Sequence, residues 1–240
     1  MKKLLFVFFA FISLQLMAQP WKSIKGDGNL KKESREISNF TSISSFGPLD
    51  VQISYGTSES LQVEADGNLL PYIETKVENG KLTIGSKQHF NLKSRSKMVV
   101  YVSMTSINSL DQHGSGNITG RGNFSNDGKT DINVSGSGNI KLDFDSFGSM
   151  DLSVSGSGNI KLKGNTVNNI TAAVSGSGNI DCTKIKCDNA DAKISGSGNI
   201  KVDVQKSIIA SISGSGNVFY KGDVTNVISK IAGSGKVVKI

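Results

Sequence analysis

The sequence predicts an all-β fold, a β-solenoid with repeats of about 20 residues, from three observations. The motif Gly-Ser-Gly-Asn recurs at intervals of 18 to 22 residues and ends with a Gly-Ser-Gly-Lys copy. Apolar and polar residues alternate between the motifs. The 240 residues include 27 glycines and only 7% aromatics, which suits a thin coil better than a thick core. The copies begin at Gly114, Gly136, Gly156, Gly176, Gly196, Gly214 and Gly233.

Each repeat predicts two short strands joined by polar turns. One repeat carries Ile160 and Leu162, followed by Ile170, Ala172 and Val174. Alternate positions face the same side of a strand, whereas glycines and β-branched residues disfavour a helix. Stacked repeats would lie about 4.8 Å apart. One internal column is therefore expected to contain Ile140, Ile160, Ile180 and Ile200.

The glycines of the motif are interpreted as structural. Either the chain turns there with a positive φ, or neighbouring backbones approach too closely for a Cβ. The asparagine that follows can hydrogen-bond to the equivalent amides above and below, as stacked asparagines do in cross-β arrays. The expected ladder contains Asn117, Asn139, Asn159, Asn179, Asn199 and Asn217.

Residues 1–18 have the features of a secretory signal peptide. Lys2 and Lys3 precede an apolar run from Leu4 to Met17, which is short for a membrane span, and Ala18 is the small residue before the cleavage site. Gln19 follows in place of the cysteine that a bacterial lipid anchor requires. We therefore expect export to the periplasm, the cell surface or the medium. We expect no transmembrane segment in the mature chain and no anchor after the repeats.

The rest of the chain divides by regularity. Residues 19–36 are a polar lead-in, 37–110 an irregular β region and 111–240 the regular repeats. Within the irregular region, Asn79-Gly80 predicts a hairpin between Val77 and Leu82. No linker rich in proline or serine precedes Gly114, which favours one continuous domain over 37–240.

The pattern of residues 37–238 resembles a known family. The resemblance rests on Phe40-x-x-Ile43, Leu49-Asp50-Val51-x-Ile53, Asn79-Gly80-Lys81-Leu82-x-Ile84 and the serial Gly-Ser-Gly-Asn-Ile motifs. Together they are similar to the head GIN domain family of auto-transporter adhesins (DUF2807). The resemblance implies a right-handed parallel β-helix, similar to pectin lyases in architecture, in exported proteins found mostly in Bacteroidetes. It also implies a role in cell adhesion, without known catalytic residues.

The acidic residues favour a non-catalytic protein. Asp131, Asp151 and Asp191 recur at one offset, as a solvated row would, and Asp143 and Asp145 lie two residues apart. A glycosidase needs two carboxylates at a defined separation, and a lyase of this architecture needs clustered acids with calcium and a base. We expect no catalytic residue, no cofactor and no metal site. A polysaccharide lyase or hydrolase remains the alternative.

The basic residues are the candidate surface contacts. Lys141, Lys161 and Lys201 share one offset with Asp181. The chain has 27 basic and 20 acidic residues, and two of the basic ones, Lys2 and Lys3, lie in the signal peptide, so the mature chain is only mildly basic. Since the lysines are spread out and no aromatic stacking platform accompanies them, nucleic acid is not an expected partner.

These observations favour an exported, adhesin-like surface-interaction protein without catalysis. The alternatives are a glycan-binding or polysaccharide-active protein and an envelope scaffold without a specific ligand. The partner is unknown from the sequence. A cell-surface glycan or an envelope component fits, and oligomerisation stays open.

The two cysteines leave two alternatives. Cys182 and Cys187 occupy inward offsets of one coil, where the preceding repeat has Leu162 and Val167. They can be small core residues, or export can allow a disulfide between them. Two cysteines alone are too few for a structural zinc site.

Overall fold

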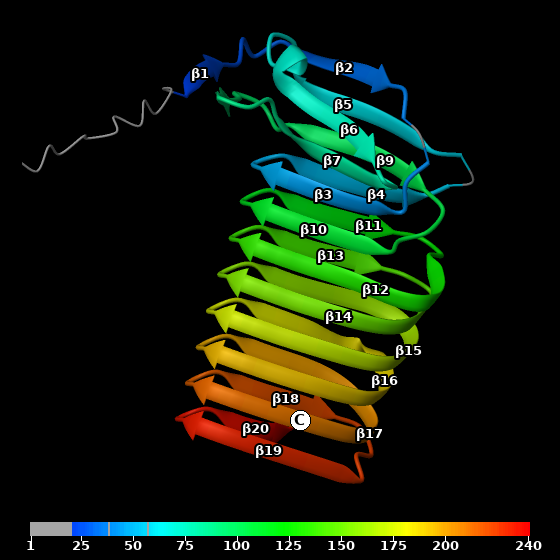
Figure 1. The fold of residues 1–240 in the computed structure, drawn as a ribbon, viewed down its shortest axis with the longest axis vertical. Coiled ribbons are helices and arrows are strands. Elements are labelled where there is room, and N and C mark those ends of the chain that lie inside the picture. The colour runs from blue at the N-terminus through cyan, green and yellow to red at the C-terminus, as the bar shows by residue number, and fades with distance from the viewer. Residues whose placement is uncertain (1–20, 38, 57) are drawn as a thin grey trace, which may run out of the picture.

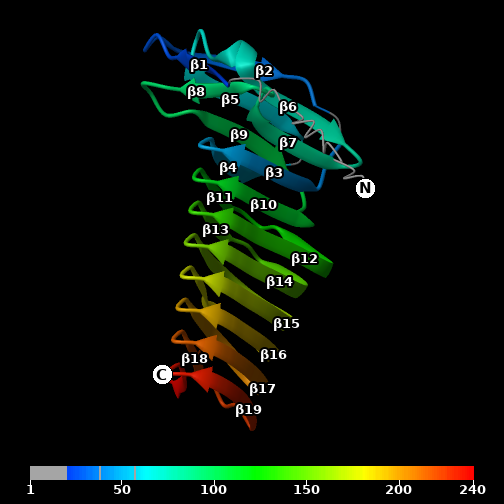
Figure 2. The same ribbon diagram turned by 60° about the vertical axis from the view of Figure 1, so that its left-hand side comes forward.

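The structure is a computed structural model that describes residues 21–37, 39–56 and 58–240. The expected signal peptide and the start of the lead-in lie outside the described residues. The chain forms a solenoid, in which an 18-stranded sheet winds around one apolar core (Figures 1 and 2). A separate two-stranded sheet pairs β1 with β8. The prediction of an all-β solenoid is confirmed.

The elements fall into an irregular first part and a regular second part. The first part contains β1 (Lys22–Lys25), β2 (Leu30–Arg35), β3 (Ser42–Gly47), β4 (Asp50–Tyr55), β5 (Ser60–Asp66), the 3₁₀ turn η1 (Leu70–Tyr72), β6 (Ile73–Glu78), β7 (Lys81–Ser86), β8 (Phe90–Lys93) and β9 (Val99–Met104). The second part contains β10 (Ser109–Gly114), β11 (Asn117–Arg121), β12 (Ser125–Gly136), β13 (Asn139–Asp143), β14 (Ser146–Gly156), β15 (Asn159–Gly176), β16 (Asn179–Gly196), β17 (Asn199–Gly214), β18 (Asn217–Lys221), β19 (Asn226–Gly233) and β20 (Lys236–Lys239). Across the described residues, no helix has the length and apolar character needed to traverse a bilayer.

The repeats stack in parallel and in register. Ile140 pairs with Ile160, Ile160 with Ile180, and Ile180 with Ile200. All four side chains are buried and form the expected column. Each rung therefore buries its alternating apolar residues against the rung on either side, as a solenoid requires.

The two glycines of each motif have different roles. Gly156 has a φ of 117°, a conformation that residues with a side chain rarely adopt. Gly158 does not have a positive φ, but a Cβ there would overlap the carbonyl oxygen of Gly138 in the preceding rung. The positive φ thus belongs to the first glycine and the close approach to the second. In addition, a Cβ on Gly156 would crowd the carbonyl of Gly136.

One expectation about the repeat is corrected. The central repeats do not break into two strands, because β15 and β16 each run for 18 residues. Pairing continues around the bend through register shifts, for example between Lys163 and Thr166 of β15. In these repeats the Gly-Ser-Gly-Asn turn joins the two faces at one edge, and a bend within a continuous strand joins them at the opposite edge.

The first part, which we call the cap, closes one end of the solenoid. β2 pairs antiparallel with β5, and β5 pairs antiparallel with β9 (Figure 1). The expected hairpin joins β6 to β7, with φ values of 49° at Asn79 and 71° at Gly80. β3 and β4 pair in parallel with β10 and β11, so the sheet runs without a break into the repeats. β1 and β2 lie within the polar lead-in, and β2 pairs with β5.

Candidate functional site

The asparagines form a hydrogen-bonded row along the solenoid. From Asn139 onward, each side-chain amide donates to the Oδ1 of the asparagine in the preceding rung, at distances of 2.8 to 3.2 Å. The row starts on Asp50, whose Oδ1 accepts from Asn117 Nδ2 at 2.9 Å. It contains Asn117, Asn139, Asn159, Asn179, Asn199 and Asn217. Because these amides bond to one another, the row fixes the register and is a structural feature.

The solenoid has two broad faces, one on each side of the core. We define the Lys face as the outward side of β4, β9, β11, β13, β18 and β20 with the first residues of β15, β16 and β17. Its central row, read from the cap toward β20, contains Tyr101, Gln52, Thr119, Lys141, Lys161, Asp181, Lys201, Phe219 and Val238. The three candidate lysines are thus brought together on one face, in adjacent rungs except where Asp181 intervenes.

The lysines of this row are exposed, and one acid partly balances them. Lys161 Nζ lies 4.0 Å from Asp181 Oδ2, at the limit of an ion pair. Burial raises the pKa of Asp181, but hydrogen bonds from Thr183 and the charges of Lys161 and Lys201 outweigh it and hold the pKa below its usual value. Asp181 is therefore ionised at neutral pH, and the row keeps a net positive charge.

Shallow hollows open onto the same face. A hollow of about 390 Å³ is lined by Asn179, Ile180, Asp181, Asn199, Lys201 and Phe219. Lys201 Nζ lies 5.5 Å from the centre of the Phe219 ring, within range of a cation–π contact. A second hollow, of about 260 Å³, lies beside Thr119, Arg121 and Lys141. Such depressions combine charged, amide and aromatic groups, which are chemically suited to a polar chain lying across the strands.

A third groove lies at the cap end of the Lys face and was not predicted. It has a volume of about 620 Å³ and is lined in part by Ser34, Gln62 and Tyr101. The Tyr101 hydroxyl donates to Glu64 Oε2 at 2.8 Å, and this bond and burial raise the pKa of Tyr101. Antiparallel pairing of β5 with β9 brings Gln62 beside Tyr101. No repeat in the sequence indicates that pairing.

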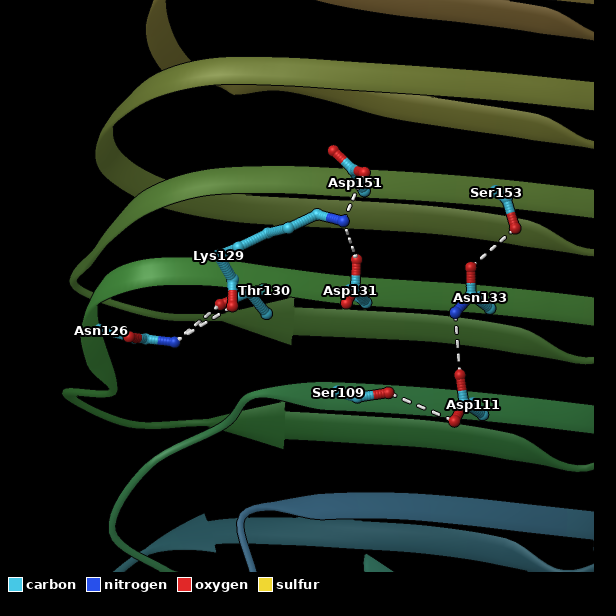
Figure 3. Close-up of polar contacts among 9 residues, drawn as sticks. All are labelled: Ser109, Asp111, Asn126, Lys129, Thr130, Asp131, Asn133, Asp151 and Ser153. Carbon is cyan, nitrogen blue, oxygen red and sulfur yellow. Dashed lines mark hydrogen bonds and ion pairs between the residues drawn. The ribbon is translucent and has the colours of Figure 1, made fainter.

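The acidic row lies on the opposite side of the core, which we call the Asp face. This face is the outward side of β3, β10, β14 and β19 with the last residues of β12, β15, β16 and β17. Figure 3 shows the part of it around Lys129 and Asp111. Lys129 Nζ bridges Asp131 at 3.0 Å and Asp151 at 2.7 Å. Lys193 Nζ lies 3.0 Å from Asp191. Each acid of the row is thus paired with a lysine on the open surface.

A partly buried hydrogen-bond network on the Asp face was also not predicted from the sequence. Asp111 accepts hydrogen bonds from Lys81, Ser109 and Asn133, and Ser153 donates to Asn133 (Figure 3 shows all but Lys81). Burial raises the pKa of Asp111, but these hydrogen bonds and the Lys81 charge bring it below its usual value. The network ties the β6–β7 hairpin to the repeats, so its role is structural.

Asp143 and Asp145 have separate partners. Asp143 Oδ2 lies 3.5 Å from Arg121 Nε, whereas Asp145 Oδ1 accepts from Asn165 Nδ2 at 2.6 Å. In the part of the chain that the structure describes, no three His, Cys, Asp or Glu side chains are placed to hold a metal ion.

Both cysteines are buried free thiols in the structure. Cys187 Sγ lies 3.4 Å from the backbone oxygen of Asp203, to which it can donate. Burial raises the pKa of Cys187 to about 12 and raises that of Cys182 further. Since only the thiolate is an effective nucleophile, neither group is set up for chemistry at neutral pH.

We expect the folded protein to resist thiol alkylation at pH 8. After denaturation without reductant, two thiols per chain should titrate with a chromogenic disulfide reagent. An absence of free thiols in the denatured exported protein would instead establish the Cys182–Cys187 disulfide.

Solved structures share this fold. A "putative adhesin" from Bacteroides fragilis is 23% identical, with a TM-score of 0.83, and the match covers 90% of this chain and 100% of that one. A "putative lipid binding protein" from Parabacteroides distasonis is 27% identical, with a TM-score of 0.73 and coverage of 91% and 100%. A "putative adhesin" from the same species is 25% identical, with a TM-score of 0.71 and the same coverage. No curated protein matches the chain.

A family model described as "Putative auto-transporter adhesin, head GIN domain" matches residues 39–224. This range includes the cap from β3 onward and most of the repeats. Because the match spans well over half of the sequence, the chain belongs to this family of adhesin head domains.

Proposed function

We propose that this protein is an exported, non-catalytic adhesin whose Lys face binds acidic glycans on a cell surface. The observation that carries the proposal is the in-register row of Lys141, Lys161 and Lys201 on an exposed face. Parallel pairing sets neighbouring rungs about 4.8 Å apart. A linear polyanion can therefore lie along the solenoid axis and contact several rungs at once.

The arrangement favours binding over turnover. A row offers several equivalent weak contacts, whose combined strength comes from simultaneous engagement. Catalysis instead needs groups preorganised around one reacting bond. The acids of the Asp face are engaged by Lys129 and Lys193, and Asp181 lies between lysines on the Lys face. The adhesin names of the family and of the similar structures agree with this proposal.

The triple variant Lys141→Ser, Lys161→Ser, Lys201→Ser tests the proposal. Retention on immobilised polygalacturonate at low salt should fall by about tenfold or more, since a tenfold change corresponds to about 1.4 kcal/mol. The matched control is Lys186→Ser, Lys193→Ser, Lys206→Ser, which removes the same charge outside the Lys face. In the parent protein, Lys193 pairs with Asp191 and Lys206 pairs with Asp188. Both ion pairs are exposed, so their loss should change stability little.

Three outcomes would contradict the proposal. Equal losses in both triple variants would show that net charge, and not the Lys face, governs retention. Shortening of polygalacturonate by the purified protein, abolished by Asp145→Asn, would establish the enzymatic alternative. Preferential binding to vesicles of anionic lipid over the glycan would favour the activity named for the Parabacteroides distasonis lipid binding protein.

Added salt should weaken glycan retention, because the contacts are exposed.

A further inference from the structure

The groove at the cap end of the Lys face differs in chemistry from the rest of that face. Its walls come from β2, β5, β9 and the end of β4, which are neighbours in the cap (Figure 1). Its volume of about 620 Å³ is within the range of pockets that hold small ligands. The lining side chains with hydroxyl or amide groups are Ser34, Ser54, Ser60, Gln62, Tyr101 and Ser103.

Strand pairing gathers these groups into two adjacent rows. Antiparallel pairing places Ser34 opposite Gln62, and Gln62 opposite Tyr101. Ser60 lies opposite Ser103 in the same way. Because alternate residues of a strand face the same side, both rows point outward into the groove. These antiparallel pairings do not recur along the solenoid, so the rows form a single site instead of a repeated one.

Most of these groups are available to a ligand. The Tyr101 hydroxyl is engaged by Glu64, and the Ser54 hydroxyl lies 3.4 Å from the Val102 carbonyl oxygen. Among the residues that the structure describes, none accepts or donates a hydrogen bond to the other side chains of the two rows. A serine hydroxyl and a glutamine amide each both donate and accept. Sugar hydroxyls need the same two functions in a partner.

The charged residues of the lining do not favour an acidic ligand. Among the described lining residues, Arg35 is the single basic one. Its guanidinium is already engaged, because Nη1 donates to the Ile73 carbonyl oxygen at 2.8 Å and Nη2 to that of Leu70 at 2.9 Å. Glu36 and Glu59 also line the groove and would repel a carboxylate or a phosphate. An uncharged ligand avoids this repulsion.

The Tyr101 ring adds an apolar surface to the groove. Lys32 Nζ lies 5.1 Å from the centre of this ring and 3.3 Å from Glu64 Oε2, which accepts from the Tyr101 hydroxyl. These contacts hold the ring in one orientation before a ligand binds. A tyrosine combines an apolar body with a polar tip, and a sugar ring likewise has C–H groups on its faces and hydroxyls at its edge. A ring that is already ordered loses little entropy on binding.

We propose that this groove binds uncharged sugar units, at a site separate from the lysines of the Lys face. Its hydroxyl and amide groups supply the hydrogen bonds, and the Tyr101 ring supplies the packing surface. The proposal goes beyond the binding of acidic glycans and does not depend on it, because none of the three candidate lysines lines the groove.

Nuclear magnetic resonance of the mature protein tests the proposal. The probes are cello-, manno- and xylogluco-oligosaccharides, which are uncharged, and the readout is the shift of assigned amide signals. At least one probe should shift the signals of Gln62 and Tyr101. Added salt should leave its affinity unchanged, since the ligand carries no charge to be screened. Oligogalacturonate should instead shift signals around Lys141 and Lys161.

The double variant Gln62→Ala, Ser103→Ala should weaken binding of that probe by about tenfold, because two hydrogen-bonding side chains are removed. The matched control is Gln52→Ala, Thr119→Ala, which removes the same kinds of groups from β4 and β11, outside the groove. It should bind the probe as the parent does. The groove variant should keep its retention on polygalacturonate, whereas the triple lysine variant should keep the uncharged probe. The two proposals can therefore fail independently.

Three results would overturn the assignment of the groove to uncharged sugars. One is the absence of a groove shift with all three probes. Another is an equal loss of affinity in the two double variants, which would place the contacts outside the groove. The last is a groove shift with oligogalacturonate alone, which would assign the groove to acidic glycans.

Discussion

Gly158→Ala should lower the free energy of unfolding by about 1–3 kcal/mol, the usual cost of overfilling a packed site. The added methyl would overlap the Gly138 carbonyl oxygen and Val134 Cγ1. Gly156→Ala should cost more, because a residue forced to a φ of 117° adds about 1–3 kcal/mol of backbone strain. Urea unfolding followed by circular dichroism measures both changes.

Gly85→Ala is the matched control. Gly85 is buried in β7, lacks a positive φ, and offers an added Cβ an ordinary contact with Phe46 at 3.4 Å. The change should be neutral or stabilising by up to about 1 kcal/mol, since alanine loses less backbone entropy than glycine on folding. If all three variants unfolded alike, neither close approach nor φ would explain the motif.

Ile160→Ala should lower the free energy of unfolding by about 2–5 kcal/mol, as large-to-small changes in packed cores do. The side chain is 1% exposed and lies between Ile140 and Ile180, so the neighbouring rungs cannot close the cavity without breaking register. Since a solenoid is stabilised by contacts between neighbouring repeats, the loss falls on both interfaces of the central rung.

Ile209→Ala provides the comparison, because Ile209 points outward from the Asp face and is 47% exposed. The Ile209→Ala change should alter the free energy of unfolding by no more than about 0.5 kcal/mol. Equal effects of the two substitutions would place the isoleucine column outside the core and contradict the assignment of inward positions.

The regular half of the fold could be predicted from the sequence because each rung repeats the same local instruction. Alternation marks the inward residues, and the spacing of the motifs sets the register that joins Ile140 to Ile200. The hairpin at Asn79-Gly80 could also be predicted, since few other residue pairs accept two positive φ values. The antiparallel pairings of the cap could not be predicted, because each occurs once and depends on long-range contacts.

The candidate site was predictable to the same extent. The shared offset identified Lys141, Lys161 and Lys201 as one row, and parallel pairing placed them there. Phe219 and Tyr101 were missed because they interrupt or precede the repeat. The Asp111–Lys81 contact joins residues of two different regions, and only the folded cap brings them together.

The equal steps of the central repeats make length a property separate from fold. Deleting residues 160–179 would join Asn159 to Ile180, and every later side chain would keep its inward or outward side. The molecule would become shorter by one rung, about 4.8 Å, while the cap and the last strands, β19 and β20, stayed as they are. Duplication of the same segment would lengthen it equally. Unequal recombination between repeats can therefore adjust how far such a head domain reaches, in uniform increments and without a new fold.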